Sequence, residues 1–107
     1  MNLISPHRGA ILREIAAEAD RGTAKHGTFD YPDGTWNGGA NIVLRTQAQD
    51  RCNRHAREGT VTALDVLDEE MREVACEEDK AALRRELLAV AAVACKWIEK
   101  LDREAGR

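Results

Sequence analysis

The chain has 107 residues, 43% of them apolar and 33% charged, and its 16 Lys and Arg against 19 Asp and Glu give a formal net charge of -3. A chain of this length is expected to form a single domain over residues 1–107, with too little material for a second core. Its acidic balance argues against nucleic-acid binding, because proteins that bind along a phosphate backbone are usually basic.

The first predicted helix begins at Ser5-Pro6 and ends near Arg21. The Ser5 hydroxyl can accept a free backbone N–H, and proline is favoured at the first helical position. Apolar residues then recur at helical spacing, at Ile11, Leu12, Ile15, Ala16 and Ala19. We expect Gly22 to end this helix.

Residues 22–39 are predicted to form a long loop, with a turn at Tyr31-Pro32-Asp33-Gly34-Thr35. Loops of this length in a small domain are usually functional or disordered. Because the loop carries Lys25 and aromatic side chains, we interpret it as a binding lid over a substrate. An ordered surface loop without a ligand is the alternative.

A second helix is predicted over residues 41–58, with Gly59 as its end. It has a thin apolar stripe and four arginines, at positions 45, 51, 54 and 57. Such arginines usually form a solvated face. They can also bind a polyphosphate where that face borders a site.

Two further helices complete the predicted fold. Thr62 and Asp65 resemble a capping box that opens a helix to about Glu78, and Asp79 can cap the next helix. The last helix has the clearest apolar seam, at Leu83, Leu87, Val90, Ala94, Trp97 or Ile98, and Leu101. Four helices without strand-like alternation predict an all-α, four-helix bundle.

The apolar arc of the last helix is wider than one neighbouring helix pair would cover, so we expect a homodimer or homotetramer.

No membrane span is predicted, because the longest apolar run, Leu87–Cys95, is far shorter than the roughly 20 residues that cross a bilayer. The first residues do not resemble a secretory signal, and we expect a cytoplasmic protein. Cys52, Cys76 and Cys95 are widely spaced and odd in number, which indicates buried thiols rather than disulfides.

Candidate functional residues are carboxylates that share a face with the apolar stripes. Glu70 falls on the apolar face of the third helix, Glu73 and Glu77 continue its row, and Glu86 falls on the apolar face of the fourth helix. An inward carboxylate is costly unless it binds a metal ion or a cation. Two explanations therefore remain: an oxygen-only metal site, or ion pairs with Arg84 and Arg85. The oxygen ligands would suit Mg2+ or Mn2+, which commonly bind together with phosphates.

These residues resemble the MazG-like family of all-α nucleoside triphosphate pyrophosphohydrolases. The family pattern is E-E-x-x-E on one helix and E-x-x-D on the next, and this chain has Glu69-Glu70-Met71-Arg72-Glu73 followed by Glu86. Lys25-His26-Gly27 and the following Tyr-Pro-Asp-Gly-Thr turn resemble the loop of actinobacterial and phage members. The resemblance covers most of the chain. A phage-encoded protein would be located in the host cytoplasm.

The resemblance implies hydrolysis of a nucleoside triphosphate to the monophosphate and pyrophosphate. Glu70, Glu73 and Glu86 would hold Mg2+ or Mn2+, and Glu69, with Glu70, would serve catalysis by orienting the attacking water. Candidate substrate-binding residues are Lys25, Arg45 and Arg51 for the phosphates, and Trp36 for the base, with Phe29 or Tyr31 as alternatives. The other explanation of these three aromatic side chains is that they only pack the loop. Some phage relatives act on dGTP, so dGTP or GTP is a candidate substrate.

The chain departs from the family pattern at its fourth position, where Ala89 replaces the usual aspartate. Water, Glu77, Asp68 or a partner subunit would have to supply the missing ligand. The alternative is a catalytically silent helical module that binds a nucleotide or a protein.

Overall fold

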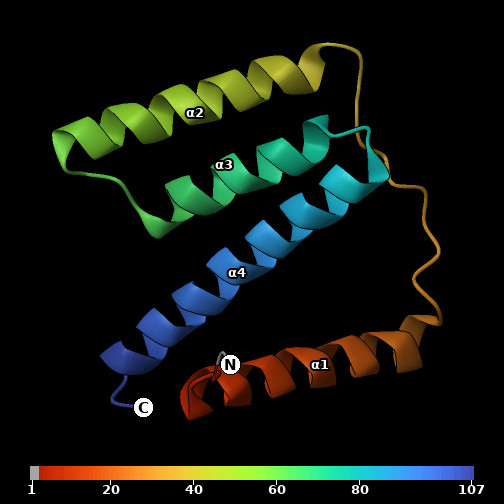
Figure 1. Cartoon of the computed structure of the whole chain (residues 1–107), viewed down its shortest axis with the longest axis vertical. Coiled ribbons are helices and arrows are strands. Elements are labelled where there is room, and N and C mark those ends of the chain that lie inside the picture. Colours follow the sequence, from red (N-terminus) through yellow and green to blue (C-terminus); the bar gives the residue numbers. More distant parts are fainter. Residues whose placement is uncertain (1–2) are drawn as a thin grey trace. The chain divides into compact units, whose positions relative to one another are not determined.

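The computed structural model describes residues 3–107, and the regular structure of this part of the chain is helical, without a strand. Its helices are α1 (Pro6–His26), α2 (Ala40–Glu58), α3 (Ala63–Cys76) and α4 (Lys80–Glu104) (Figure 1). The predicted all-α chain of four helices is therefore confirmed. That the helices close into a MazG-like bundle stays a prediction.

The chain divides into two compact units, which share α4. The terminal unit contains α1, the loop up to Pro32 and the end of the chain from Cys95. In it, His7 Nε2 lies 2.9 Å from Asp102 Oδ2, and Arg8 Nε donates to Glu99 Oε1 over 2.5 Å. The central unit runs from Asp33 to Ala94 and contains α2, α3 and the first part of α4.

The first helix is one turn longer than the sequence predicted. Gly22 does not end α1, which continues to His26, and the predicted loop is shortened to residues 27–39. The reason is conformational: a glycine in helical conformation costs only about 1 kcal/mol relative to alanine and does not break the helix. Gly27 has a φ of 80° and ends α1, with its N–H bonded to the Thr23 carbonyl over 2.8 Å.

The predicted capping residues of the other helices are confirmed. Gly59 ends α2 in the left-handed conformation, with a φ of 73°. Thr62 and Asp65 form a capping box in front of α3, which ends at Cys76 rather than at Glu78. Asp79 Oδ2 accepts the Ala82 N–H at the start of α4, over 2.9 Å. Only the short segments 59–62 and 77–79 separate α2 from α3 and α3 from α4.

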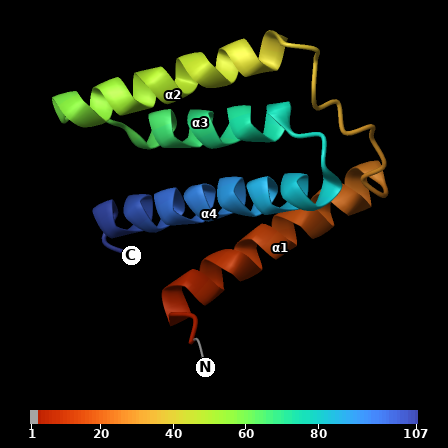
Figure 2. The same ribbon diagram turned by 45° about the horizontal axis from the view of Figure 1, so that its top comes forward.

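Helices α2 and α3 lie side by side and run in opposite directions, as both views of the chain show (Figures 1 and 2). This pairing places one face of α3 against α2 over its whole length. The buried side chains of the central unit are Ala48, Cys76 and Leu83, one from each helix. The central unit is therefore the part of the fold that positions the predicted site.

Burial is less complete than the sequence predicted. Leu83 at the start of the α4 seam is buried, but Leu87 and Leu101 are about half exposed. Cys76 and Cys95 are buried as predicted, whereas Cys52 is only half-buried. Among the described residues, no helix combines the length and the apolar character needed to cross a membrane.

Candidate functional site

The other predicted carboxylates of α3 and α4 lie close enough to Glu70 for their charges to act on it. Burial raises the pKa of the Glu70 carboxyl above its usual range, and the negative charge of Glu86 raises that pKa further. Glu69 and Glu73 act in the same direction, with smaller effects. The structure therefore brings all of the predicted catalytic and metal-binding glutamates into one electrostatic cluster in the central unit.

Glu73 lies on the side of the cluster that contacts α2. Its Oε1 accepts a 2.6 Å hydrogen bond from Gln49 Nε2, and its Oε2 lies 3.8 Å from Arg45 Nη1. The Nε atom of Arg45 is buried and has no hydrogen-bond partner among the described residues. Arg45 is thus held beside the carboxylates with part of its hydrogen-bonding capacity unused.

The remaining acidic residues of α3 on this side form a row of polar pairs with α2. Arg51 Nη1 donates to Asp68 Oδ2 over 2.9 Å, and His55 Nδ1 lies 2.8 Å from Asp65 Oδ2. The pairs Arg45–Glu73, Arg51–Asp68 and His55–Asp65 follow one another in the order expected for antiparallel helices. We call this row the α2–α3 polar seam.

The Cys52 thiol joins the polar seam through Glu69. A hydrogen bond with the Glu69 carboxylate raises the pKa of Cys52 to about 11, with burial and the negative charges of Glu69 and Asp65 acting in the same direction. A thiol with this pKa is protonated at neutral pH, so Cys52 is a poor nucleophile here.

Ion pairs with Arg84 and Arg85 do not explain the inward carboxylates. Both arginines are exposed, and neither forms an ion pair within residues 3–107. The arginines that do pair with α3 come from α2, or from α3 itself through Arg72 and Asp68, whose atoms are 3.5 Å apart. The side chains of Glu70 and Glu86 have no hydrogen-bond or ion-pair partner in the described part of the chain.

The structure also bears on the missing fourth ligand. Ala89, one turn after Glu86, offers no oxygen from its side chain. Asp68 is paired with Arg51 and Arg72, and Glu77 Oε1 accepts the N–H of Asp79 over 3.1 Å. Within residues 3–107, no three His, Cys, Asp or Glu side chains are grouped so that they could hold a metal ion.

The donor set nevertheless has the chemistry that Mg2+ prefers. Magnesium is usually bound by one or two carboxylates together with water and substrate phosphates, rather than by a cage of protein ligands. Glu70 and Glu86 supply two such carboxylates, and the raised pKa of Glu70 indicates negative charge that no nearby cation compensates. These two residues therefore fit the implied ion, with Glu73 as a third ligand only if it leaves Gln49.

A small apolar cavity accompanies the carboxylates. It has a volume of about 200 Å3 and is lined by Met71, Val74, Leu87 and Val90. Each of these residues directly follows a position of the motif, because they come after Glu70, Glu73, Glu86 and Ala89. The cavity gives the cluster an apolar neighbour, which agrees with burial as the main cause of the raised Glu70 pKa.

The predicted substrate-binding residues are distributed over both units. Arg45 and Arg51 lie in the polar seam, whereas Lys25 is exposed in the last turn of α1, in the terminal unit. The Trp36 N–H donates to the Ala75 carbonyl over 2.7 Å, and Trp36 has a φ of 60°, which is rare for a residue other than glycine. Its side chain is 42% exposed.

Two contacts of α2 were not predicted from the sequence. Gln49 binds Glu73, and Asn41 Nδ2 donates to the Ala75 carbonyl over 3.2 Å. The signal was present in the spacing, because Asn41, Arg45 and Gln49 follow one another at intervals of four and so lie on one helix face.

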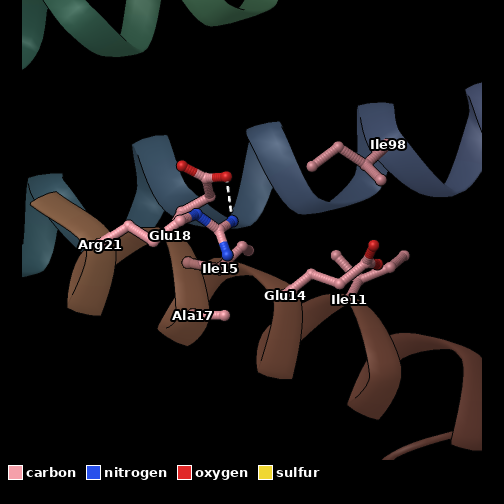
Figure 3. Close-up of a pocket in the computed structure, with 7 residues that line it drawn as sticks. All are labelled: Ile11, Glu14, Ile15, Ala17, Glu18, Arg21 and Ile98. Atoms are coloured by element: carbon pink, nitrogen blue, oxygen red, sulfur yellow. Dashed lines mark hydrogen bonds and ion pairs between the residues drawn. The ribbon is translucent and has the colours of Figure 1, made fainter.

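A second, larger groove lies in the terminal unit (Figure 3). It has a volume of about 470 Å3 and is lined by Ile11, Glu14, Ile15, Ala17, Glu18, Arg21 and Ile98. Glu18 and Arg21, neighbours on α1, form an ion pair beside it. No predicted catalytic, metal-binding or substrate-binding residue lines this groove.

Comparison of the chain with protein-family models, with curated proteins and with solved structures gives no match. The likeness to MazG-like enzymes therefore rests on the motif residues and the loop residues themselves. In the structure, the negative charges of Glu86, Glu69 and Glu73 act on Glu70 and raise its pKa.

Proposed function

We propose that the protein is a divalent-metal-dependent nucleoside triphosphate pyrophosphohydrolase, which converts an NTP or dNTP, with dGTP or GTP as the candidate, to the monophosphate and pyrophosphate. The observation that carries this proposal is the uncompensated charge of Glu70 beside Glu86. Carboxylates kept together without a cation are costly, and a bound divalent ion would remove that cost. The motif resemblance supplies the reaction.

Glu70 and Glu86, with Glu73, would hold Mg2+ or Mn2+. When bound, such an ion neutralises charge on phosphate oxygens and lowers the pKa of a coordinated water. Glu69 would orient the attacking water, because its carboxylate is an acceptor on the same turn of α3. The Cys52 thiol, by donating to Glu69, would hold that carboxylate in place.

The phosphates require cationic partners, and α2 supplies them beside the carboxylates. Arg45 is the better placed candidate, because its contact with Glu73 is long and its Nε is unpartnered within residues 3–107. Arg51 would have to leave Asp68 to bind a phosphate. Lys25 as a phosphate ligand and Trp36 as a stacking partner of the base complete the proposed set of substrate contacts.

We propose further that the enzyme works in the cytoplasm as a homodimer or homotetramer, since its substrates are cytoplasmic and apolar side chains of the central unit remain exposed. A partner subunit could then supply the ligand that is missing at Ala89. Neither a membrane nor a nucleic acid is part of this proposal.

The second candidate is a catalytically silent module that binds a nucleotide or a protein. Ala89 is the observation that favours it, together with the engagement of Asp68 and Glu77 elsewhere. This candidate predicts nucleotide affinity or capture of a partner without release of pyrophosphate. The two candidates therefore differ in one measurable product.

The deciding experiment is incubation of the purified protein with each common NTP and dNTP, first with Mg2+ and then with Mn2+. Monophosphate and pyrophosphate are measured by chromatography. We expect equal amounts of both from one or a few nucleotides, and loss of at least about a hundredfold of the activity in Glu70→Gln. Glu78→Gln, which changes an exposed glutamate beyond the end of α3, is the matched control and should keep full activity.

Two results would overturn the assignment. Release of neither product from any nucleotide by a folded protein would support the silent module. Full activity of the Glu70→Gln variant would show that the carboxylate cluster does not perform the reaction. Circular dichroism of each variant establishes that it is folded.

A further inference from the structure

A cavity of about 370 Å3 lies in the terminal unit, where the end of α1 meets the loop that follows it. Its lining combines small residues, which include Gly22, with the polar side chains of Thr23 and His26 and the rings of Phe29 and Tyr31. The volume is in the range of about 300–1,000 Å3 that is usual for small-molecule sites. A mostly apolar lining with a few polar groups is also typical of such sites.

The two aromatic rings present unused stacking surface. Phe29 and Tyr31 contact each other edge to face, with ring centroids 4.9 Å apart and an interplanar angle of 77°. Phe29 is nevertheless 87% exposed and Tyr31 63% exposed. Because the rings are nearly perpendicular, a planar ligand that stacks on one ring can turn its edge toward the face of the other, and both contacts are favourable for aromatic groups.

Gly22 provides an independent observation. In a helix interior only proline is less favourable than glycine. Gly22 nevertheless lies inside α1, four residues before its end. Its backbone is helical, and a Cβ built on it would meet no atom within 4 Å. Neither backbone conformation nor packing within the chain therefore requires glycine here. Its effect is to leave the cavity open to the close approach of a ligand.

We propose that this cavity binds a planar nitrogen heterocycle of the nucleobase class, stacked on Phe29 or Tyr31 above the open surface at Gly22. Base stacking on aromatic side chains is a general mode of nucleotide binding that tolerates different bases. The choice of a nucleobase among planar rings rests on the proposed function, in which Phe29 or Tyr31 would then take the place of Trp36 as the stacking partner of the base. The cavity and its rings do not depend on that function.

Two polar side chains can contact the edge of the base. The Thr23 hydroxyl and the His26 imidazole both line the cavity, and neither has a side-chain hydrogen-bond partner within the described chain. A hydroxyl both donates and accepts, and a neutral imidazole does the same through its two nitrogens. These groups match the ring nitrogens and the exocyclic amino and carbonyl groups of a base.

The test is a titration of the whole protein with free nucleosides, namely adenosine, guanosine, cytidine and thymidine, in the absence of metal and phosphate. Binding is followed by amide and side-chain NMR signals of Gly22, Gly27 and Tyr31. We expect saturable shifts at these residues with at least one nucleoside. Glu78→Gln, which changes an exposed glutamate outside the cavity, should bind the nucleoside as well as the wild type does.

Two variants locate the site. Gly22→Leu places a side chain in the cavity while improving helix propensity, so the protein should stay folded. Phe29→Ala removes one stacking surface, and Val43→Ala, a loss of an exposed apolar side chain in the central unit, is its control. We expect both Gly22→Leu and Phe29→Ala to weaken binding by about tenfold or more, and Val43→Ala to leave it unchanged.

The outcomes separate this inference from the proposed function. Nucleoside binding that Gly22→Leu abolishes, in a protein without hydrolytic activity, would support this site and contradict the proposed function. Hydrolysis with no nucleoside shifts at the cavity, or with unchanged binding by Gly22→Leu, would overturn this site alone. Shifts of the same signals that depend on protein concentration and not on nucleoside would show that a second copy of the chain occupies the cavity, which also overturns it.

Discussion

Cys52 shows how one contact across the α2–α3 polar seam changes the chemistry of a side chain. Its hydrogen bond with Glu69 raises its pKa to about 11, so roughly one thiol in a thousand is ionised at pH 8. Removing the Glu69 charge should lower that pKa and accelerate alkylation of Cys52 at pH 8 by at least about tenfold in Glu69→Gln. Iodoacetamide labelling, read peptide by peptide in a mass spectrometer over a range of pH, measures this.

The other two cysteines serve as internal references for that experiment. Cys76 and Cys95 are buried, so their labelling should be slow and equal in the wild type and in the variant. An unchanged labelling rate of Cys52 in Glu69→Gln would contradict the contact. Equal acceleration of all three thiols would indicate general unfolding instead.

Glu70 gives a stability prediction whose sign follows from its pKa. The pKa of Glu70 in the folded protein is raised above its ordinary value of 4.5, mainly by burial and then by the charge of Glu86. The folded state therefore holds the proton more tightly than the unfolded state does, and stability falls as the pH rises through that window. This loss of folding stability is absent below pH 4.5 and fully present at pH values above the raised pKa of Glu70.

A neutral side chain at this position should remove the penalty. We expect Glu70→Gln to melt at a higher temperature than the wild type at pH 7, and the difference to disappear below about pH 4.5. Thermal melts of both proteins, without divalent ions and over this pH range, measure it. A lower melting temperature of Glu70→Gln at pH 7 would mean that the carboxylate is stabilising. Glu78→Gln is the exposed control.

At the scale of single helices, the capping box of α3 is the clearest local stabilising feature. The Asp65 N–H donates to Thr62 Oγ1 over 3.1 Å, and the Thr62 N–H donates to Asp65 Oδ2 over 3.0 Å. Thr62→Ala should reduce the free energy of unfolding by about 1 kcal/mol, because the helix loses its N-cap acceptor. Urea unfolding measures this loss.

The control for the cap is a threonine without a capping role. Thr28 lies in the loop after α1, and Thr28→Ala should change the free energy of unfolding by less than about 0.5 kcal/mol. Equal losses in the two variants would show that the capping box does not stabilise α3.

Local signals predicted most of the helix boundaries, and their one clear failure is instructive. Ser5, Thr62, Asp79 and Gly59 act where the sequence placed them, because capping depends on residues within one turn. Gly22 and Gly27 look alike in the sequence. Only the backbone of Gly27 adopts a positive φ, so the end of α1 could not be assigned from composition alone.

Contacts between helices were less predictable than the helices themselves. The spacing of Glu70 and Glu86 on apolar faces predicted that they lie near each other, which agrees with the effect of the Glu86 charge on the pKa of Glu70. The partners of Glu73 and Asp68 could not be derived, because they depend on which face of α2 packs against α3. That register is set by side chains distant in sequence, and it selects Arg45 and Arg51 rather than Arg84 and Arg85.

At the scale of the whole molecule, the wide apolar arc predicted for the last helix remains largely uncovered in the single chain. Four large apolar side chains of α3 and α4 in the central unit are between 49% and 62% exposed, namely Leu64, Met71, Leu87 and Leu88. Exposed apolar side chains at this density usually mark an interaction surface. For a chain of 107 residues, which can bury only part of its surface, a second copy is the simplest partner.

We therefore expect the protein to elute as a dimer or tetramer of its 11.9 kDa chain, and light scattering coupled to size-exclusion chromatography measures this mass. Leu88→Glu should shift the assembly towards the monomer, because it places a charge on the apolar surface and buries it in the interface. Lys96→Glu, a charge change at an exposed position of α4, should leave the mass unchanged. A wild-type mass of 11.9 kDa at the protein concentration of the activity assays would contradict self-association, and would also remove a partner subunit as the source of the ligand missing at Ala89.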